Sequence, residues 1–161
     1  MDSKIEKAMN EQINKEFYSA YLYLSMAAYF ETKGLPGCSH WMQKQAKEEQ
    51  SHGMKFFDFL NDRGCRVVLQ AIEKPPADFS STKKVFETTL SHEQTVTASI
   101  NHLYALAQAA KDNAAMVFLA WFINEQVEEE KNAMAILAKF DYIKEESAGM
   151  LMLDKELGSR E

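Results

Sequence analysis

Residues 41–63, with the sequence WMQKQAKEEQSHGMKFFDFLNDR, decide the fold that this chain is predicted to adopt. As a helix, this stretch presents one apolar stripe. The apolar members of the stripe are Met42, Ala46, Phe56 and Leu60. Glu49 occupies a position within the stripe, and His52 lies on the same face about one turn later. An ionised carboxylate in an apolar interior is costly unless a cation accompanies it. Glu-x-x-His on a core-facing helix is one half of a carboxylate-bridged dinuclear metal site, whereas an exposed charged patch explains the motif more simply when it stands alone.

Three further segments show the same periodicity and are predicted to be helices, at about residues 3–33, 82–110 and 113–140. Ser3 and Glu6 match the capping-box pattern, so we expect Ser3 to cap the first of these helices. The chain is therefore expected to contain four long helices.

An acid interrupts the apolar stripe of every long helix near its middle. These acids are Glu16, Glu49, Glu93 and Glu129. One such acid is easily explained as lying at the edge of a stripe, but four at matching depth would meet at one level when the helices stack. Two divalent cations would balance the four carboxylates, and without metal the close like charges should raise some carboxylate pKa values. Oxygen-rich ligation with one imidazole and no thiolate favours Fe(II) or Mn(II) over a structural zinc site, and occupancy by zinc or manganese stays an alternative.

The connection between the second and third helices predicts how the helices are arranged. Residues 65–80 lack a helical pattern, and Pro75 and Pro76 exclude a helix there. A segment of this length can span roughly 50 Å, enough to return along the whole second helix. The sequence thus predicts an all-α four-helix bundle with one long crossover, followed by a short apolar segment at residues 147–157 that packs against a bundle end or a partner. We expect residues 1–161 to form a single domain.

The net charge and the two cysteines limit which partners and which cell compartment are expected for this protein. The net charge of −6 argues against nucleic acids and anionic membranes as partners, and we expect neither a secretory signal nor a membrane span. Cys38 and Cys65 would lie about 40 Å apart on either side of the second helix, too far for a disulfide, which needs Cα atoms within about 7 Å. Unpaired thiols favour the cytoplasm.

Polar residues beside the four acids are further candidates. Gln126 lies three residues before Glu129. Three more acids adjoin the predicted ligands, namely Glu48, Glu125 and Glu128. They could form a third, weaker cation site on the flank, or they could be a solvated acidic face.

Tyr23 lies two turns after Glu16 on the same face. Its hydroxyl could donate a hydrogen bond to a ligand or supply an electron to oxygen, or it could satisfy a network in the core. Trp121 is a candidate second electron source or a buried core residue. We expect His40, His92 and His102 to be surface or structural residues, because no acids converge on them.

Three stretches resemble the bacterial and archaeal non-haem ferritins: residues 14–24, Glu48-Glu49-x-x-His52 and residues 124–130. The resemblance covers essentially the whole chain. It implies a ferritin-like four-helix bundle with one long crossover and a short C-terminal fifth helix. It also implies a homo-oligomeric shell of 24 subunits that oxidises Fe(II) with dioxygen or hydrogen peroxide at a di-iron ferroxidase centre and stores ferric mineral inside.

The resemblance also implies a role for each candidate residue. Glu16 and His52 would be terminal ligands of one iron, and Glu49 would bridge both ions. Glu93 and Glu129 would bind the second iron, with Gln126 beside it. The implied third iron site consists of Glu48, Glu125, Glu128 and Glu129, the implied redox tyrosine is Tyr23, and the short C-terminal helix would line a four-fold axis.

Departures from related families sharpen the resemblance. Bacterioferritins and many di-iron oxygenases repeat Glu-x-x-His on the fourth helix, where this chain has Gln126-x-x-Glu129. Gln50 stands where bacterioferritins have a haem-binding Met, so we expect no haem, and a rubrerythrin would need a CxxC domain. Two alternatives remain at this point: a non-storing di-iron oxidase or peroxide scavenger of the same fold, and a non-enzymatic helical interaction protein whose acids are solvated.

Overall fold

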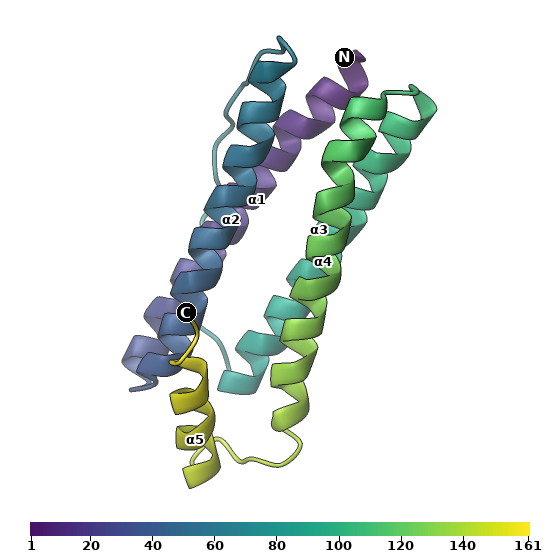
Figure 1. The fold of residues 1–161 in the computed structure, drawn as a ribbon. Helices are drawn as coiled ribbons and strands as arrows, with labels where there is room; N and C mark the ends of the chain where they lie inside the picture. The colour runs from purple at the N-terminus through teal and green to yellow at the C-terminus, as the bar shows by residue number, and fades with distance from the viewer.

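The computed structural model describes all 161 residues. It contains five helices and no strand (Figure 1). The helices are α1 (Ser3–Thr32), α2 (Pro36–Asp62), α3 (Thr82–Ala109), α4 (Asn113–Lys139) and α5 (Ala148–Leu157). The first four form a long bundle, and the short α5 lies at one end of it. The predicted fold class is therefore confirmed. No helix of the chain combines the length and the apolarity that crossing a membrane requires.

The bundle consists of two antiparallel helix pairs, α1 with α2 and α3 with α4, each joined by a short turn (Figure 1). The crossover, residues 63–81, returns from the end of α2 to the start of α3, so α2 and α3 run in the same direction. It follows α1: Val68 N donates to Asn10 Oδ1 at 2.7 Å, and Ser25 Oγ donates to the carbonyl of Pro76 at 2.6 Å. These bonds anchor an irregular segment whose own backbone has no secondary structure to satisfy it.

Two predicted helix starts were wrong. Asp2, and not Ser3, caps α1, because its carboxylate accepts a hydrogen bond from Lys4 N at 2.8 Å. Helix α2 begins at Pro36, so Cys38, which was expected just before the helix, lies inside its first turn. A proline is well suited to the first turn, since its fixed φ is helical and the amide hydrogen that it lacks would have no helical partner. Both cysteines are unpaired, as predicted.

The apolar interior is divided into two clusters. One includes Phe30, Trp41 and Phe86 near the α5 end of the bundle. The other includes Phe56 and Phe122 near the N-terminus of α1. Trp121, which we considered as a buried core residue, is 40% exposed and belongs to neither cluster. The polar residues between the two clusters are therefore enclosed by apolar packing on both sides along the bundle axis.

Helix α5 packs on the first turn of α2, as expected of a segment that closes a bundle end. Cys38 N donates to Asp154 Oδ1 at 2.8 Å. A Cβ atom on Gly37 would lie only 1.7 Å from the carbonyl oxygen of Asp154. Glycine is thus required at position 37 for this close approach.

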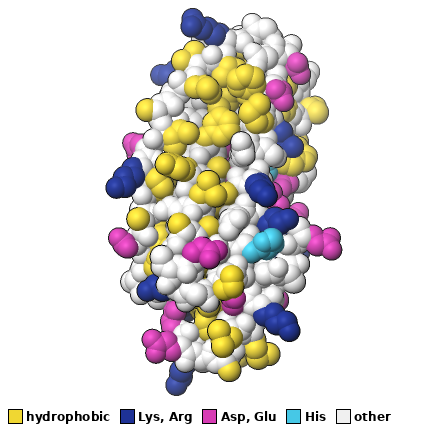
Figure 2. Space-filling view, turned by 90° about the vertical axis from the view of Figure 1, so that its left-hand side faces the viewer, with side chains coloured by type: hydrophobic (Ala, Val, Ile, Leu, Met, Phe, Trp, Pro, Cys, Tyr) yellow, Lys and Arg dark blue, Asp and Glu magenta, His cyan; other side chains and the backbone are white.

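Hydrophobic side chains also reach the surface and gather on the face that carries α1, α2 and the crossover (Figure 2). The large exposed hydrophobic residues of α1 and the crossover are Tyr21, Leu24, Val68, Leu69 and Ile72. Tyr21, Leu24 and Ile72 line a groove of about 400 Å³ together with Phe17 and Ala46.

Candidate metal centre

The four acids that interrupt the helix stripes all lie in the interior of the bundle. Glu16, Glu49 and Glu93 are each 1% exposed, and Glu129 is 5% exposed. Each comes from a different helix, α1 to α4 in chain order. Because the apolar clusters exclude water on both sides, these carboxylates have lost most of their hydration.

Glu16, Glu49 and His52 form the tightest group. One ligand atom from each lies within 4.8 Å of the other two, and all three residues are buried. The distance from His52 Nδ1 to Glu49 Oε1 is 3.6 Å, too long for a hydrogen bond. Ligand atoms that share one ion at about 2.1 Å lie roughly 3 to 4 Å apart. Their spacing therefore fits a shared cation better than a direct bond.

Glu49 Oε1 is buried and accepts no hydrogen bond. An unsatisfied carboxylate oxygen in the interior is expensive, and native interiors rarely contain one. In a helix stripe with Glu16 beside it, this oxygen is suited to a bound cation.

Glu93 and Glu129 are held by hydrogen bonds from neighbouring helices. Gln126 Nε2 donates to Glu93 Oε2 at 3.1 Å, and the Tyr23 hydroxyl donates to Glu93 Oε1. Gln45 Nε2 donates to Glu129 Oε2 at 2.5 Å. Glu129 also belongs to a second candidate metal group, with His52 and Glu125, whereas Glu93 belongs to neither group in this structure.

Two buried glutamines were missed from the sequence, Gln12 and Gln45. Gln12 Nε2 donates to Glu16 Oε1 at 2.8 Å. Gln45 Nε2 donates in the same way to Glu129 Oε2, at 2.5 Å. Each lies four residues before a stripe acid, Gln12 before Glu16 and Gln45 before Glu49. A polar residue one turn before an interior acid was the signal that could have found them.

The electrostatics of the layer follow from burial and like charge. Burial, and then the charges of Glu93 and Glu129, raise the pKa of Glu49 well above its ordinary value. Burial, and then the charge of Glu49, do the same to the pKa of Glu16. Burial, followed by the charge of Glu93, raises the pKa of Glu129 to about 8. Burial and like charge thus favour the protonated form of these carboxyl groups in the metal-free layer, in the direction expected from the sequence.

The flanking acids are only partly brought together. Glu125 Oε1 lies 3.8 Å from His52 Nε2, and the Glu125 side chain is 27% exposed. Glu48 accepts a hydrogen bond from Arg160, and Glu128 is exposed. Neither belongs to a candidate metal group. The third cation site thus stays a prediction, with Glu125 as the flanking acid nearest to the centre.

The aromatic candidates lie next to the layer. Tyr23 is fully buried, and burial, followed by the charge of Glu93, raises its pKa. The Trp121 ring meets the His52 ring edge-on, with centroids 5.5 Å apart. Lys55 Nζ lies over the Trp121 ring, 4.6 Å from its centroid. His92 is structural, since its Nε2 is 2.7 Å from Ser19 Oγ and burial lowers its pKa to about 4.

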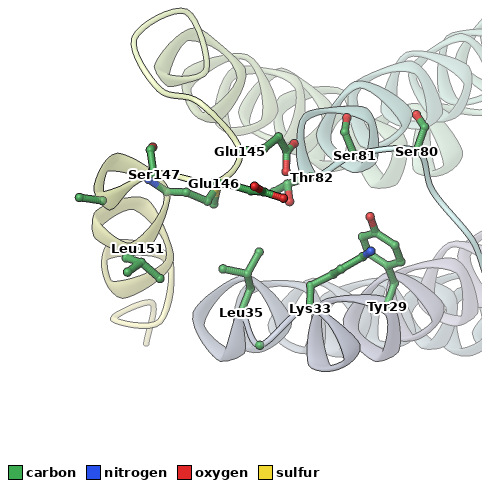
Figure 3. A pocket seen from close by; sticks show the side chains of 13 residues that line it. Tyr29, Lys33, Leu35, Ser80, Ser81, Thr82, Glu145, Glu146, Ser147 and Leu151 are labelled. Atoms are coloured by element: carbon green, nitrogen blue, oxygen red, sulfur yellow. Dashed lines mark hydrogen bonds between the residues drawn. The ribbon is translucent and has the colours of Figure 1, made fainter.

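An open cavity lies away from the acid layer. It has a volume of about 650 Å³ and opens between the end of α1, the start of α3 and the loop before α5 (Figure 3). Its labelled polar residues include Lys33, Ser80, Thr82, Glu145 and Glu146. None of the interior acids lines it, so the metal chemistry has to be sought in the bundle interior.

A layer of buried carboxylates with one imidazole, inside a four-helix bundle with a long crossover, defines the class of carboxylate-ligated metal-binding bundles. The chain matches the ferritin-like domain over residues 6–143 and belongs to the ferritin-like domain family. Membership in this family supports iron storage as the function and iron as the metal. The resemblance drawn from the sequence motifs is thereby confirmed.

Individual proteins agree with this family assignment. A protein of Haemophilus influenzae, named a probable bacterial non-haem ferritin-like protein, is 39% identical over 159 residues, covering 99% of this chain and 96% of that protein. A bacterial non-haem ferritin of Staphylococcus aureus is 37% identical over 160 residues, with the same coverage of both chains. An open-pore ferritin from the hyperthermophilic archaeon Archaeoglobus fulgidus has a TM-score of 0.98 at 48% identity, covering 100% of this chain and 99% of that chain. A closed form of that ferritin, engineered by site-directed mutagenesis, has a TM-score of 0.97.

Proposed function

We propose that this protein is an iron-storage ferroxidase. Each subunit, a single domain, oxidises Fe(II) at a di-iron centre, and ferric mineral is deposited inside a closed oligomer of these subunits. The unsatisfied oxygen of Glu49 supports this proposal most strongly. It lies between acids from other helices and beside His52, where a cation can satisfy it.

The position of each residue in the acid layer suggests which of the two Fe(II) ions it binds. Glu16 and His52 bind one Fe(II), Glu93 and Glu129 bind the other, and Glu49 contacts both. Gln126 and Tyr23 donate to Glu93 and keep that carboxylate oriented. Carboxyl groups that carry protons in the metal-free protein release them when Fe(II) binds.

The electron balance sets what else is needed. Two Fe(II) ions give up one electron each, and dioxygen takes both electrons and two protons to become hydrogen peroxide. Hydrogen peroxide can instead be the oxidant, in which case two electrons and two protons convert it into two water molecules. Full reduction of dioxygen to two water molecules takes four electrons and four protons. We propose that in this case the di-iron pair supplies two electrons, an Fe(II) at the third site supplies one and Tyr23 supplies one, with the phenol proton leaving along the hydrogen bond to Glu93.

Storage requires a shell, and the surface supports association. The hydrophobic residues that gather over α1 and the crossover are exposed in the single chain (Figure 2). Contiguous exposed apolar groups of this kind mark interaction sites. We propose that they are covered by further copies of this chain in an assembly of about 24 subunits, as the family resemblance implies.

The test combines oxidation with storage. Fe(II) is added to the protein in air, the ferric absorbance is followed, and iron per subunit and particle mass are measured. We expect rapid oxidation, a large particle and iron far in excess of two ions per subunit. A small oligomer that holds only two irons per subunit would instead indicate a non-storing oxidase of the same fold.

A matched pair of variants tests the centre itself. Glu49→Ala should abolish Fe(II) oxidation, while Glu31→Ala, which removes an exposed acid of α1 outside every predicted site, should retain it. Equal oxidation by Glu49→Ala and the wild type would show that the interior acids are not the centre.

A further inference from the structure

The C-terminal tail brings a cation next to the acid layer. After α5 the chain ends beside α2 (Figure 1). There Arg160 Nη1 donates to Gln45 Oε1 at 2.8 Å, and Nη2 donates to Glu48 Oε2 at 2.5 Å. The guanidinium also lies 4.8 Å from the ring centroid of Trp41, and His40 Nε2 donates to the Arg160 carbonyl at 2.8 Å. Four contacts therefore fix this side chain and its backbone against one helix.

The tail is held in place before it reaches Arg160. Asp154 accepts from Cys38 N, and its carbonyl packs on Gly37. A Cβ on Gly158 would come within 3.1 Å of Gly37 Cα. These backbone contacts fix where the last residues of the chain lie relative to α2.

Arg160 determines which end of the Gln45 amide faces the acids. A guanidinium has only donors, so the group that it contacts on Gln45 must be the carbonyl oxygen. The amide nitrogen then points the other way, where Nε2 donates to Glu129 Oε2 at 2.5 Å. If the amide were reversed, it would place a donor against Arg160 and an oxygen against a carboxylate.

We propose that Arg160 is a positioning residue for the metal centre, which orients the Glu129 carboxylate through the Gln45 amide. The proposal rests on the proposed function, in which Glu129 binds Fe(II). Arg160 touches neither the metal nor the oxidant, and its effect passes along the path Arg160–Gln45–Glu129. The same guanidinium also donates a hydrogen bond to Glu48, an acid of the predicted third site.

The test uses the full-length protein and two probes, Co(II) binding followed by its visible absorption and Fe(II) oxidation in air. Outer partners of metal ligands contribute about 10- to 100-fold to metal affinity. Because Arg160 acts through one intermediate group, Arg160→Ala should weaken Co(II) binding and raise the half-saturating Fe(II) concentration by about three- to tenfold. The maximal oxidation rate should change less, since the orientation of a ligand acts first on binding.

Three further variants separate positioning from general damage to the tail. Arg160→Lys keeps the charge but not the planar pair of donors, so it should restore only part of the affinity. Lys155→Ala removes an exposed cation of α5 and should behave as the wild type. Gln45→Leu should weaken Co(II) binding, and adding Arg160→Ala to it should have no further effect, because residues on one path are not additive.

The outcomes distinguish this role from the function on which it rests. Equal Co(II) affinity in the wild type and Arg160→Ala, or additive effects of Arg160→Ala and Gln45→Leu, would overturn the positioning role. A wild-type protein that binds Co(II) without oxidising Fe(II) would contradict the proposed function, and the Co(II) comparison would still test Arg160. A wild type that binds no Co(II) would overturn both.

Discussion

The apolar clusters and the acid layer between them contribute to the bundle in opposite ways. Phe86 in one cluster and Phe56 in the other are fully buried among apolar side chains, and their burial stabilises the fold. Glu16 and Glu49 are buried to the same degree but lie next to like charges. In the metal-free protein this burial opposes folding.

The difference shows how one bundle can both fold and bind metal. The two clusters extend along all four helices and hold them in register, so the middle can carry carboxylates that water does not neutralise. Sites with such local destabilisation are common where function requires it. The comparison predicts that substitutions in the two regions change stability with opposite signs.

Replacing an aromatic residue of a cluster should have the largest effect on stability. Phe86→Ala removes a ring that contacts Phe30, Trp41 and Phe140, and should lower the free energy of unfolding by about 3 to 5 kcal/mol. Glu49→Gln, of nearly equal volume, should leave the metal-free protein equally stable or more stable. Denaturant unfolding of both variants without metal, at one subunit concentration, measures this. A larger loss in Glu49→Gln than in Phe86→Ala would reverse the comparison.

The acid layer should also make stability depend on pH. The folded-state pKa of Glu129 is about 8, above its ordinary value, so its contribution to stability is complete below the unfolded pKa and is lost as the pH rises toward 8. Metal-free protein should therefore lose at least about 1 kcal/mol between pH 5 and pH 8. Glu129→Gln should reduce that loss.

A divalent cation should reverse this trend. Co(II) competes with protons for the carboxylates, so the loaded protein should gain stability over the same pH range. Thermal unfolding with Co(II), and again after removal by a chelator, measures both states. A metal-free protein whose melting temperature stays constant from pH 5 to pH 8 would show that folding does not raise the pKa of Glu129.

Most of the fold could be predicted because the spacing of apolar residues within each helix indicates which face is buried. The apolar stripes predicted four helices, and the interruptions at Glu16, Glu49, Glu93 and Glu129 placed acids in the interior. The long crossover and its proline pair then implied the parallel arrangement of α2 and α3. These features are local or depend on chain length alone.

Features that depend on a neighbouring segment could not be predicted. Arg160 contacts Gln45 and Glu48, more than a hundred residues away, and its own surroundings show no periodicity. Trp121 is half-exposed although its neighbour Phe122 is buried, because a one-residue step turns the side chain away from the core. The Asp2 cap was missed because both Asp2 and Ser3 are good capping residues.

A smaller effect is expected at the hydroxyl of Tyr23. Tyr23→Phe keeps the ring in its buried position and removes the hydrogen bond to Glu93. A typical hydrogen bond contributes about 1 kcal/mol, so Fe(II) oxidation should slow by about three- to tenfold. The control is Tyr142→Phe, at an exposed tyrosine. Unchanged oxidation in Tyr23→Phe would limit Tyr23 to packing.

The smallest effect should come from the flank of the layer, where exposure weakens the electrostatic contrast with the core. Glu125 is the flanking acid that shares a candidate group with His52 and Glu129. Glu125→Gln should therefore weaken the binding of a third Co(II) per subunit, while the initial rate of Fe(II) oxidation stays within about twofold, as for a surface substitution. Glu128→Gln, at an exposed position outside both groups, should weaken the binding of the third ion less and leave the oxidation rate unchanged. Calorimetric titration with Co(II) measures the stoichiometry. A third ion lost in Glu128→Gln but retained in Glu125→Gln would move the flanking site to the surface of α4, away from the buried layer.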